Sequence, residues 1–267
     1  MSDPGETNRR AWDLAALKYE GDLERDVGFL RAGGVSLLET ERSYLGDLSG
    51  WCQRAVHLQC SHGLDTLSMW NLGADEVVGL DVSARMLAQA ERKAELLGAP
   101  ARWIEADVLS APSELDGTAD LVYTGKGALP WVADLDAWGR VVARLLKRGG
   151  MLYVLDGHPL DWVWEPGAGG FELRSDGGDY FFEGPRVNRD FPASAIARAV
   201  PAGSDVPDAV EWQWTLGQTV TSVARAGLRL QELQEHPDQY WPKFGAMPQE
   251  LADRLPHTFS LVARKPE

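Results

Sequence analysis

The chain has 267 residues, of which 44% are hydrophobic and 25% are charged, the composition of a soluble protein with one large domain or one domain and a cap. Its net charge of −14 argues against nucleic acid as a partner, because no surplus of lysine and arginine exists to displace phosphate counterions. No apolar run approaches the roughly 18 residues of a membrane span, the two cysteines support neither a disulfide framework nor a zinc site, and the polar start shows no signal peptide. We therefore expect a cytoplasmic protein without a membrane partner or a bound metal.

The first part of the chain contains helical patterns. Between residues 7 and 20, apolar side chains from Trp12 to Tyr19 recur at steps of three and four, which places them on one face of a helix. A second helix is expected over residues 37–45. Helices this short cannot form a core by themselves, so we expect residues 1–50 to pack on the main domain as a helical cap.

Strands and helices alternate between residues 55 and 156. The expected strands are Ala55–Gln59, Val77–Asp81, Ala101–Glu105, Ala119–Tyr123 and Met151–Leu155. The expected helices cover residues 64–72, 83–97 and 135–146. This alternation predicts parallel βαβ units with helices on both faces of one sheet, and we assign residues 51–160 to this core.

Residues 161–210 interrupt the alternation with many prolines and glycines. Within them, Phe171–Arg174 and Tyr180–Glu183 flank Asp176-Gly177-Gly178-Asp179, a pattern typical of a hairpin. A segment this long without core elements is usually functional or mobile. We expect it to be an insertion that acts as a lid.

The last part of the chain returns to the core pattern. A helix is expected over residues 215–226, and strands over 228–236 and 258–263. We assign residues 211–267 to the C-terminal part of the core.

The most informative motif is a strand, a loop and a second strand between Ala55 and Asp81. The loop ends at Gly63, and Asp81 stands 18 residues further on, at the tip of the next strand. A nucleoside-binding βαβ unit has this arrangement, because the glycine lets the backbone approach the ligand and the acid accepts hydrogen bonds from ribose hydroxyls. A carboxylate here can also favour the dipole of the helix that begins at residue 83. Asp107, after the third strand, can accept from the amine of a base or simply occupy a turn.

These motifs together resemble those of class I S-adenosylmethionine-dependent methyltransferases. The matching segments are Val56–Gly63, Asp81 with Val82 and Met86, Glu105–Val108, Ala119–Tyr123 and Leu145–Met151. More narrowly, Leu58–Leu67 resembles a bacterial subset with Leu-Gln-Cys-x-x-Gly-x-Asp-Thr-Leu in this loop, as does the late Glu235-His236-Pro237. The resemblance covers most of the chain outside parts of the insertion.

The resemblance implies an α/β fold, a Rossmann-like, seven-stranded, mostly parallel sheet with an antiparallel end, and S-adenosyl-L-methionine as the cofactor. The implied cofactor-binding residues are Gln59, Cys60, Ser61 and Gly63 at the methionine part, Asp81 at the ribose, Val82, Met86, Asp107 and Val108 at the adenine, and Thr124 and Gly125 facing the methionine tail and the substrate. Most of this family has an acid where His57 stands, and we expect His57 and His62 to support the loop.

Methyl transfer from a sulfonium is an in-line displacement, so alignment does much of the work, and a base is needed only when the nucleophile arrives protonated. His158 follows the fifth strand at the edge where open α/β sheets bind ligands, and we predict it as the catalytic residue, acting as a base or by positioning the substrate. The expected acceptor pocket contains Trp131, Trp162, Trp164 and His236, because aromatic walls suit flat or apolar substrates. Packing in the core or against the cap is the alternative role for these tryptophans.

We therefore predict a methyltransferase that acts on an oxygen, nitrogen or sulfur nucleophile of a small molecule. Tyr123–Gly127 lacks the Asn/Asp-Pro-Pro-aromatic signature of enzymes that methylate nucleobases or glutamine. One alternative is a non-catalytic protein that binds S-adenosylmethionine or S-adenosylhomocysteine, because Gln59 and Ser61 stand where glycines are common. A second is an NAD-dependent oxidoreductase, against which the missing Gly-x-Gly-x-x-Gly motif and the strand pair after residue 227 argue.

Overall fold

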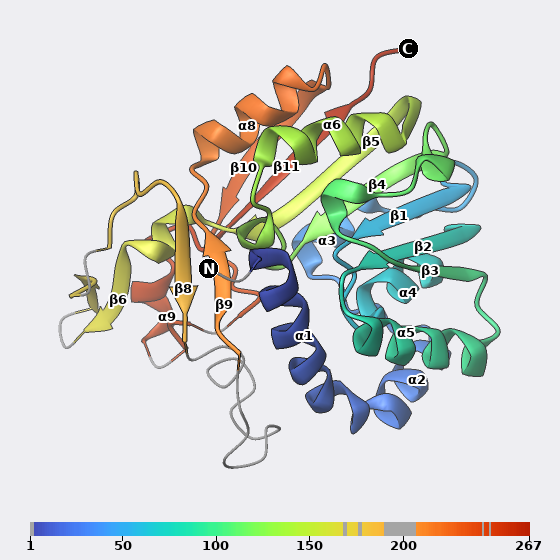
Figure 1. Cartoon of the computed structure of the whole chain (residues 1–267), viewed down its shortest axis with the longest axis horizontal. Helices are drawn as coiled ribbons and strands as arrows, with labels where there is room; N and C mark the ends of the chain where they lie inside the picture. The colour runs from blue at the N-terminus through green and yellow to red at the C-terminus, as the bar shows by residue number, and fades with distance from the viewer. Residues whose placement is uncertain (1–2, 168–169, 176–177, 190–206, 242, 246) are drawn as a thin grey trace.

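A seven-stranded sheet in the order β10-β11-β5-β4-β1-β2-β3 forms the centre of the computed structural model (Figure 1). The structure describes residues 3–167, 170–175, 178–189, 207–241, 243–245 and 247–267. The strands of the sheet are β1 (Arg54–Leu58), β2 (Glu76–Asp81), β3 (Ala101–Glu105), β4 (Ala119–Gly125), β5 (Leu146–Gly157), β10 (Arg229–His236) and β11 (Thr258–Arg264). Strands β1 to β5 are parallel, and β11 is antiparallel to both β5 and β10. The predicted Rossmann-like sheet with an antiparallel end is confirmed.

Helices cover both faces of this sheet. They are α4 (Leu64–Asn71), α5 (Ala84–Leu97), α6 (Leu135–Leu145) and α8 (Leu216–Arg225), whereas the short α9 (Gln249–Ala252) lies in the connection before β11. Trp138 of α6 and Val223 of α8 belong to one buried cluster, and Leu67 and Met69 of α4 belong to a second. Each helix therefore buries one apolar stripe against its own side of the sheet. No helix in the described part of the chain is long and apolar enough to cross a membrane.

Three helices precede the sheet: α1 (Pro4–Glu20), α2 (Leu23–Arg31) and α3 (Glu39–Leu45). The sequence predicted α1 and α3 but not α2, whose buried residues are only Asp26, Val27 and Leu30 and therefore too few for a clear helical period. Helix α1 packs against α5 and β9. Figure 1 shows it in front of the sheet, between β9 and the ends of β1 to β3.

The insertion pairs differently from the prediction. Its strands are β6 (Trp164–Gly167), β7 (Gly170–Leu173), β8 (Pro185–Asn188) and β9 (Ala209–Trp212). Strand β6 pairs with β7 and β8 with β9, both antiparallel, so the predicted hairpin of Phe171–Arg174 with Tyr180–Glu183 was wrong. Phe171 instead packs edge-on against Trp164 and Phe244, which holds β7 beside β6. Parts of the predicted turn and lid, namely Asp176, Gly177 and residues 190–206, lie outside the described residues.

Candidate functional site

A cavity of about 470 Å³ lies at the carboxyl ends of β1 to β4. Its walls are the loops that follow these four strands, and residues of α1 and β9 complete it. The residues predicted to bind the cofactor or the acceptor that line it are Gln59, Cys60, Ser61, Asp81, Val82, Asp107, Val108, Gly125 and Trp131. The fold thus gathers most of the predicted residues in one place, because parallel strands end at the same edge of a sheet.

Asp81 is held at the tip of β2 by two backbone hydrogen bonds. Its Oδ2 accepts from the N–H of Ser61 at 2.7 Å, and its Oδ1 accepts from the N–H of Ser83 at 2.9 Å. Burial raises the pKa of Asp81 to about 6. Each carboxylate oxygen keeps a lone pair that can accept from a ligand hydroxyl, which fits the role predicted for Asp81.

The loop after β1 has a glycine-type backbone without the usual glycines. Gln59, Ser61 and Gly63 have φ angles of +59°, +49° and +78°, and a left-handed conformation costs a residue with a side chain about 1–3 kcal/mol. The hydrogen bond from Ser61 to Asp81 offsets part of this strain. At Gly63 a Cβ atom would lie 2.5 Å from the Cβ of Ala90 in α5, so any other residue would have to displace its neighbours.

Gln59 bridges two walls of the cavity. Its Nε2 donates to the carbonyl oxygen of Ala128, in the loop after β4, at 2.9 Å. Its Oε1 is buried and has no hydrogen-bond partner among the described residues. A buried acceptor without a donor is costly, so this oxygen fits the ammonium group of an amino-acid ligand.

Three predicted cofactor residues stand behind the cavity wall. Gly63, Met86 and Thr124 do not belong to its lining. Met86 is fully buried, with its sulfur 3.6 Å from the hydroxyl of Ser61, and therefore supports the loop from below. Direct contact of these three residues with the cofactor stays a prediction.

A cluster of buried charges forms another part of the wall, and the sequence did not predict it. Lys126, which follows β4, lies 2.9 Å from a carboxylate oxygen of Asp65 and 3.5 Å from one of Glu41. Glu41 of α3 is completely buried and accepts a hydrogen bond from the hydroxyl of Tyr123. Burial raises the pKa of Glu41. The cluster joins the N-terminal segment to the loops after β1 and β4.

Asp156, near the end of β5, holds the loop after β4 in place. Its carboxylate accepts from the N–H groups of Gly127 and Leu129, at 2.7 and 2.8 Å. Burial raises the pKa of Asp156 to about 6. The acid thus shapes the wall on which Gly125 and Ala128 lie.

Two histidines line the cavity, His57 of β1 and His62 of the loop that follows it. The Nδ1 of His57 lies 2.8 Å from the hydroxyl of Thr66, and burial lowers the pKa of His57 to about 4. The Nδ1 of His62 lies 2.6 Å from the ammonium of Lys93, and burial lowers the pKa of His62 to about 3. Both imidazoles are therefore neutral near pH 7.

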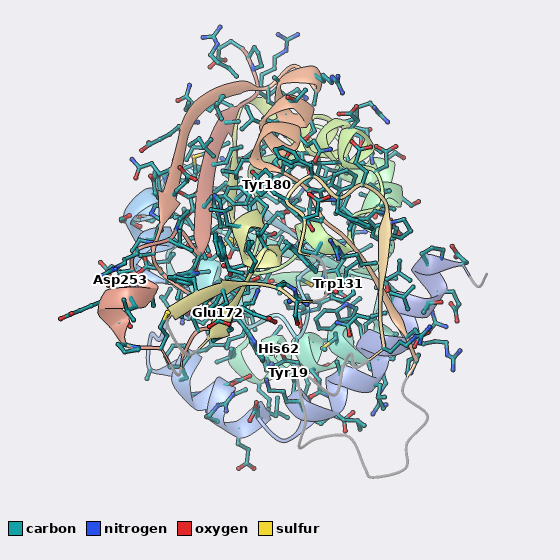
Figure 2. The ribbon with its side chains drawn as sticks, turned by 90° about the vertical axis from the view of Figure 1, so that its left-hand side faces the viewer. Tyr19, His62, Trp131, Glu172, Tyr180 and Asp253 are labelled. Atoms are coloured by element: carbon teal, nitrogen blue, oxygen red, sulfur yellow. The ribbon has the colours of Figure 1, made fainter. Side chains whose placement is uncertain are left out.

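Helix α1 covers the cavity along its length. Gly5, in its first turn, lies beside Asp107, whereas Tyr19, in its last turn, stacks on His62 with ring centroids 3.9 Å apart. Between them, Trp12 meets Trp131 edge-on at 5.2 Å. Figure 2 shows Tyr19 and His62 next to each other, with Trp131 further up. The sequence placed Trp12 and Tyr19 on one face of a helix, but not at the cavity.

The remaining predicted residues lie elsewhere. His158, Trp162, Trp164 and His236 do not line the cavity. The Nε2 of His158 lies 2.8 Å from Glu235, and its Nδ1 accepts from the N–H of Leu160 at 3.1 Å. His236 lies 2.7 Å from the hydroxyl of Ser260. The roles predicted for these residues stay predictions, and the geometry of His158 favours a link between β5 and β10.

Comparison with known proteins agrees with this geometry. Residues 55–150 match the family model of the methyltransferase domain. This stretch has the sequence pattern of a methyltransferase domain. The match agrees with the predicted enzyme class, and together with the antiparallel end of the sheet it disfavours the oxidoreductase. The narrower resemblance of the loop to a bacterial subset stays a prediction.

Individual known proteins share part of the sequence or the fold of this chain. A demethylmenaquinone methyltransferase of Thermus thermophilus is 42% identical over 84 residues, 32% of this chain and 37% of that protein. The chain thus matches little more than a third of the length of this curated relative. An S-adenosylmethionine-dependent methyltransferase structure from Mesorhizobium loti is 25% identical, covers 85% of this chain and 96% of its own, and has a TM-score of 0.61. A geranyl diphosphate C-methyltransferase from Streptomyces coelicolor, 15% identical over 85% of this chain and 74% of its own, has the same fold with a TM-score of 0.56.

Proposed function

We propose that this chain transfers the methyl group of S-adenosylmethionine to an oxygen, nitrogen or sulfur atom of a small molecule. The observation that carries the proposal is that Asp81 and Gln59 both line one cavity at the edge of the sheet, where the Oε1 of Gln59 has no hydrogen-bond partner among the described residues. The first fits ribose hydroxyls and the second fits an ammonium group. Ribose hydroxyls and an ammonium group occur together in a nucleoside that is linked to an amino acid.

The charge of the cavity suits a cationic ligand. Its described lining contains the carboxylates of Asp3, Asp65, Asp81 and Asp107 and the single ammonium of Lys126. His57 and His62 add no charge near pH 7, because burial lowers the pKa of each. A sulfonium centre is therefore bound without repulsion from a nearby surplus of positive charge.

The cofactor, when bound, supplies a methyl group on sulfur that an aligned nucleophile displaces in line. The residues of this chain bind and orient the two reactants and exclude water. Asp81 holds the ribose and Asp107 holds the adenine, while Trp12 and Tyr19 of α1 cover the cavity. Because alignment supplies most of the acceleration, we assign no general base among the cavity residues.

Aromatic side chains favour a flat or apolar acceptor. Trp12, Trp131 and Trp212 come from three separate elements and line the cavity together, and such walls bury large apolar area. The named acceptors of two relatives, demethylmenaquinone and geranyl diphosphate, are also small molecules. The second relative is a C-methyltransferase, so a carbon nucleophile is the alternative that the experiment below must separate.

The test is to incubate a small-molecule extract with the protein and methyl-labelled S-adenosylmethionine, and to identify labelled products by mass spectrometry and NMR. We expect a labelled product with the wild type and much less with Asp81→Asn. A label on carbon would replace the proposed acceptor atom. Tight binding of the cofactor without any transfer would favour the non-catalytic binding protein, and no binding would contradict both.

A further inference from the structure

A buried ion pair lies behind the loop after β1. The ammonium of Lys93 in α5 and the carboxylate of Asp26 in α2 are 3.0 Å apart, and both side chains are almost completely buried. Lys93 also donates to two atoms of His62, the backbone oxygen at 2.9 Å and the ring Nδ1 at 2.6 Å. The ammonium thus has two acceptors in His62 and an ion-pair partner in Asp26, whose nearest oxygen lies 3.6 Å from Nδ1, beyond hydrogen-bond distance.

These contacts decide which nitrogen of His62 carries the ring proton. An ammonium has hydrogens to give and no lone pair to accept with, so Nδ1 must accept and Nε2 must hold the hydrogen. No described residue accepts a hydrogen bond from Nε2. The ring itself is held flat against Tyr19, with 16° between the two planes.

His62 and Gln59 are complementary parts of one loop. Both line the cavity, and Gln59 offers a buried acceptor, Oε1, whereas His62 offers a donor, Nε2–H. The end of an α-amino acid has a donor, the ammonium, and an acceptor, the carboxylate. Lys126 is a poorer candidate for the carboxylate, because its charge is already shared by Asp65 and Glu41.

We propose that His62, locked in the Nε2–H form by Lys93 and Asp26, donates a hydrogen bond to the carboxylate of the amino-acid part of S-adenosylmethionine. The inference rests on the proposed function, since it concerns the same cavity. It makes His62 a cofactor-positioning residue that cannot accept a proton from the acceptor through Nε2.

The first test compares two nucleosides by titration calorimetry. S-adenosylhomocysteine has the amino-acid part, and 5′-methylthioadenosine lacks it. In His62→Phe the ring can still stack on Tyr19, and Lys93 keeps Asp26 and the backbone oxygen as partners. We expect this variant to bind S-adenosylhomocysteine about tenfold or more weakly, the effect of losing a charge-assisted hydrogen bond, and to bind methylthioadenosine as the wild type does.

Each other result would overturn the assignment in a recognisable way. An equal loss of affinity for both nucleosides means that His62 only supports the loop. Unchanged affinity for both means that the carboxylate of the cofactor binds elsewhere. That result includes the case in which His62 binds a carboxylate of the acceptor. If neither nucleoside binds the wild type, the proposed function itself fails. A variant that does not fold leaves a second measurement, two-bond ¹H–¹⁵N correlation NMR of the wild type without ligand. It should show His62 as the Nε2–H tautomer at pH 7, and the Nδ1–H tautomer would refute the lock.

Discussion

Asp13 of α1 accepts a hydrogen bond from the side chain of Ser83, with 2.7 Å between Oδ1 and Oγ. Ser83 also caps α5 through a bond from the N–H of Met86, and its own N–H binds Asp81. One serine therefore connects the helix that covers the cavity to the carboxylate predicted to hold the ribose. We therefore expect the packing of α1 and the order at Asp81 to be coupled through this contact.

We expect Asp13→Ala to loosen α1 and to weaken the binding of S-adenosylhomocysteine by several-fold, since a hydrogen bond of this kind contributes roughly 1 kcal/mol. Hydrogen exchange should show that the amides of residues 4–20 are protected by the ligand in the wild type and less so in the variant. Glu6→Ala is the control, because it removes a carboxylate of the same helix that pairs only at the surface, with Arg9. Identical exchange of α1 with and without ligand would contradict its role as a cover.

Asp81→Asn should weaken the binding of S-adenosylhomocysteine by tens of fold, from the loss of about 2–3 kcal/mol of charge-assisted hydrogen bonding. Ligand affinity should also depend on pH. Burial raises the pKa of Asp81 to about 6 in the free protein, and hydroxyl donors lower it in the complex. A group whose pKa falls on binding is protonated more readily in the free state, so affinity should decrease as the pH falls through 6.

Calorimetry between pH 7.5 and 5 measures this dependence. Asp156 also has a pKa raised by burial to about 6, and its protonation would loosen the loop after β4. The two effects separate in Asp81→Asn, which keeps only the contribution of Asp156. If affinity depends on pH in the same way in the wild type and in Asp81→Asn, Asp81 is not the group whose titration changes the affinity.

Gly63→Ala and Gly98→Ala form a matched pair. Both glycines have a left-handed backbone, with φ of +78° and +66°, but a Cβ atom at Gly63 would lie 2.5 Å from the Cβ of Ala90, whereas nothing lies within 4 Å of one at Gly98. We expect Gly98→Ala to cost about 1 kcal/mol of unfolding free energy and Gly63→Ala about 1–3 kcal/mol more, from overpacking. Urea unfolding measures both. Equal losses of unfolding free energy would show that α5 behind the loop shifts at little cost to make room for the added methyl group.

Lys126→Met should lower the unfolding free energy by about 2 kcal/mol or more, because it leaves the carboxylates of Glu41 and Asp65 without their cation in a mostly buried place. Lys147→Met removes a lysine from a more exposed pair with Asp120 and should cost at most about 1 kcal/mol. Thermal unfolding of the two variants side by side checks this. Similar small losses would mean that water screens the Lys126 cluster.

His158→Ala distinguishes a structural link from the base predicted by the sequence. Its partners in the structure are Glu235 and the N–H of Leu160, so we expect a loss of about 1–2 kcal/mol in stability with unchanged affinity for S-adenosylhomocysteine and little change in turnover. A base would instead lower turnover by ~10²–10⁴-fold. Once the labelling experiment has identified an acceptor, the turnover of the folded fraction with that acceptor decides between these results.

The parts of the site that depend on strand order were predictable from sequence. An apolar strand that ends at residue 81 or 105 places the next polar residue at the sheet edge, and parallel pairing brings such edges together. At Gln59 and Ser61 the sequence showed only that glycines are usual there, and the left-handed backbone of both residues comes from the structure. These inferences need no knowledge of how distant segments meet.

The rest of the site depends on contacts between distant segments. Glu41 reaches Lys126 and Tyr123 only after the N-terminal helices have packed. No pattern in the neighbouring sequence predicts that its carboxylate is buried. The same holds for Tyr19 on His62. The orientation of His158 could not be predicted for a different reason. Successive residues of a strand face opposite sides, so its place after β5 did not decide whether its ring would face the cavity or β10.

The position of α1 has a practical consequence. Asp3 and Pro4 already belong to the lining of the cavity, so a tag or fusion partner attached to the amino end would begin at the rim of the ligand site. The carboxyl end follows β11, whose last residue Arg264 pairs with Met151 near the opposite end of the parallel strands (Figure 1). Labels, surface tethers and affinity tags are therefore better attached there, away from helix α1 and the cavity.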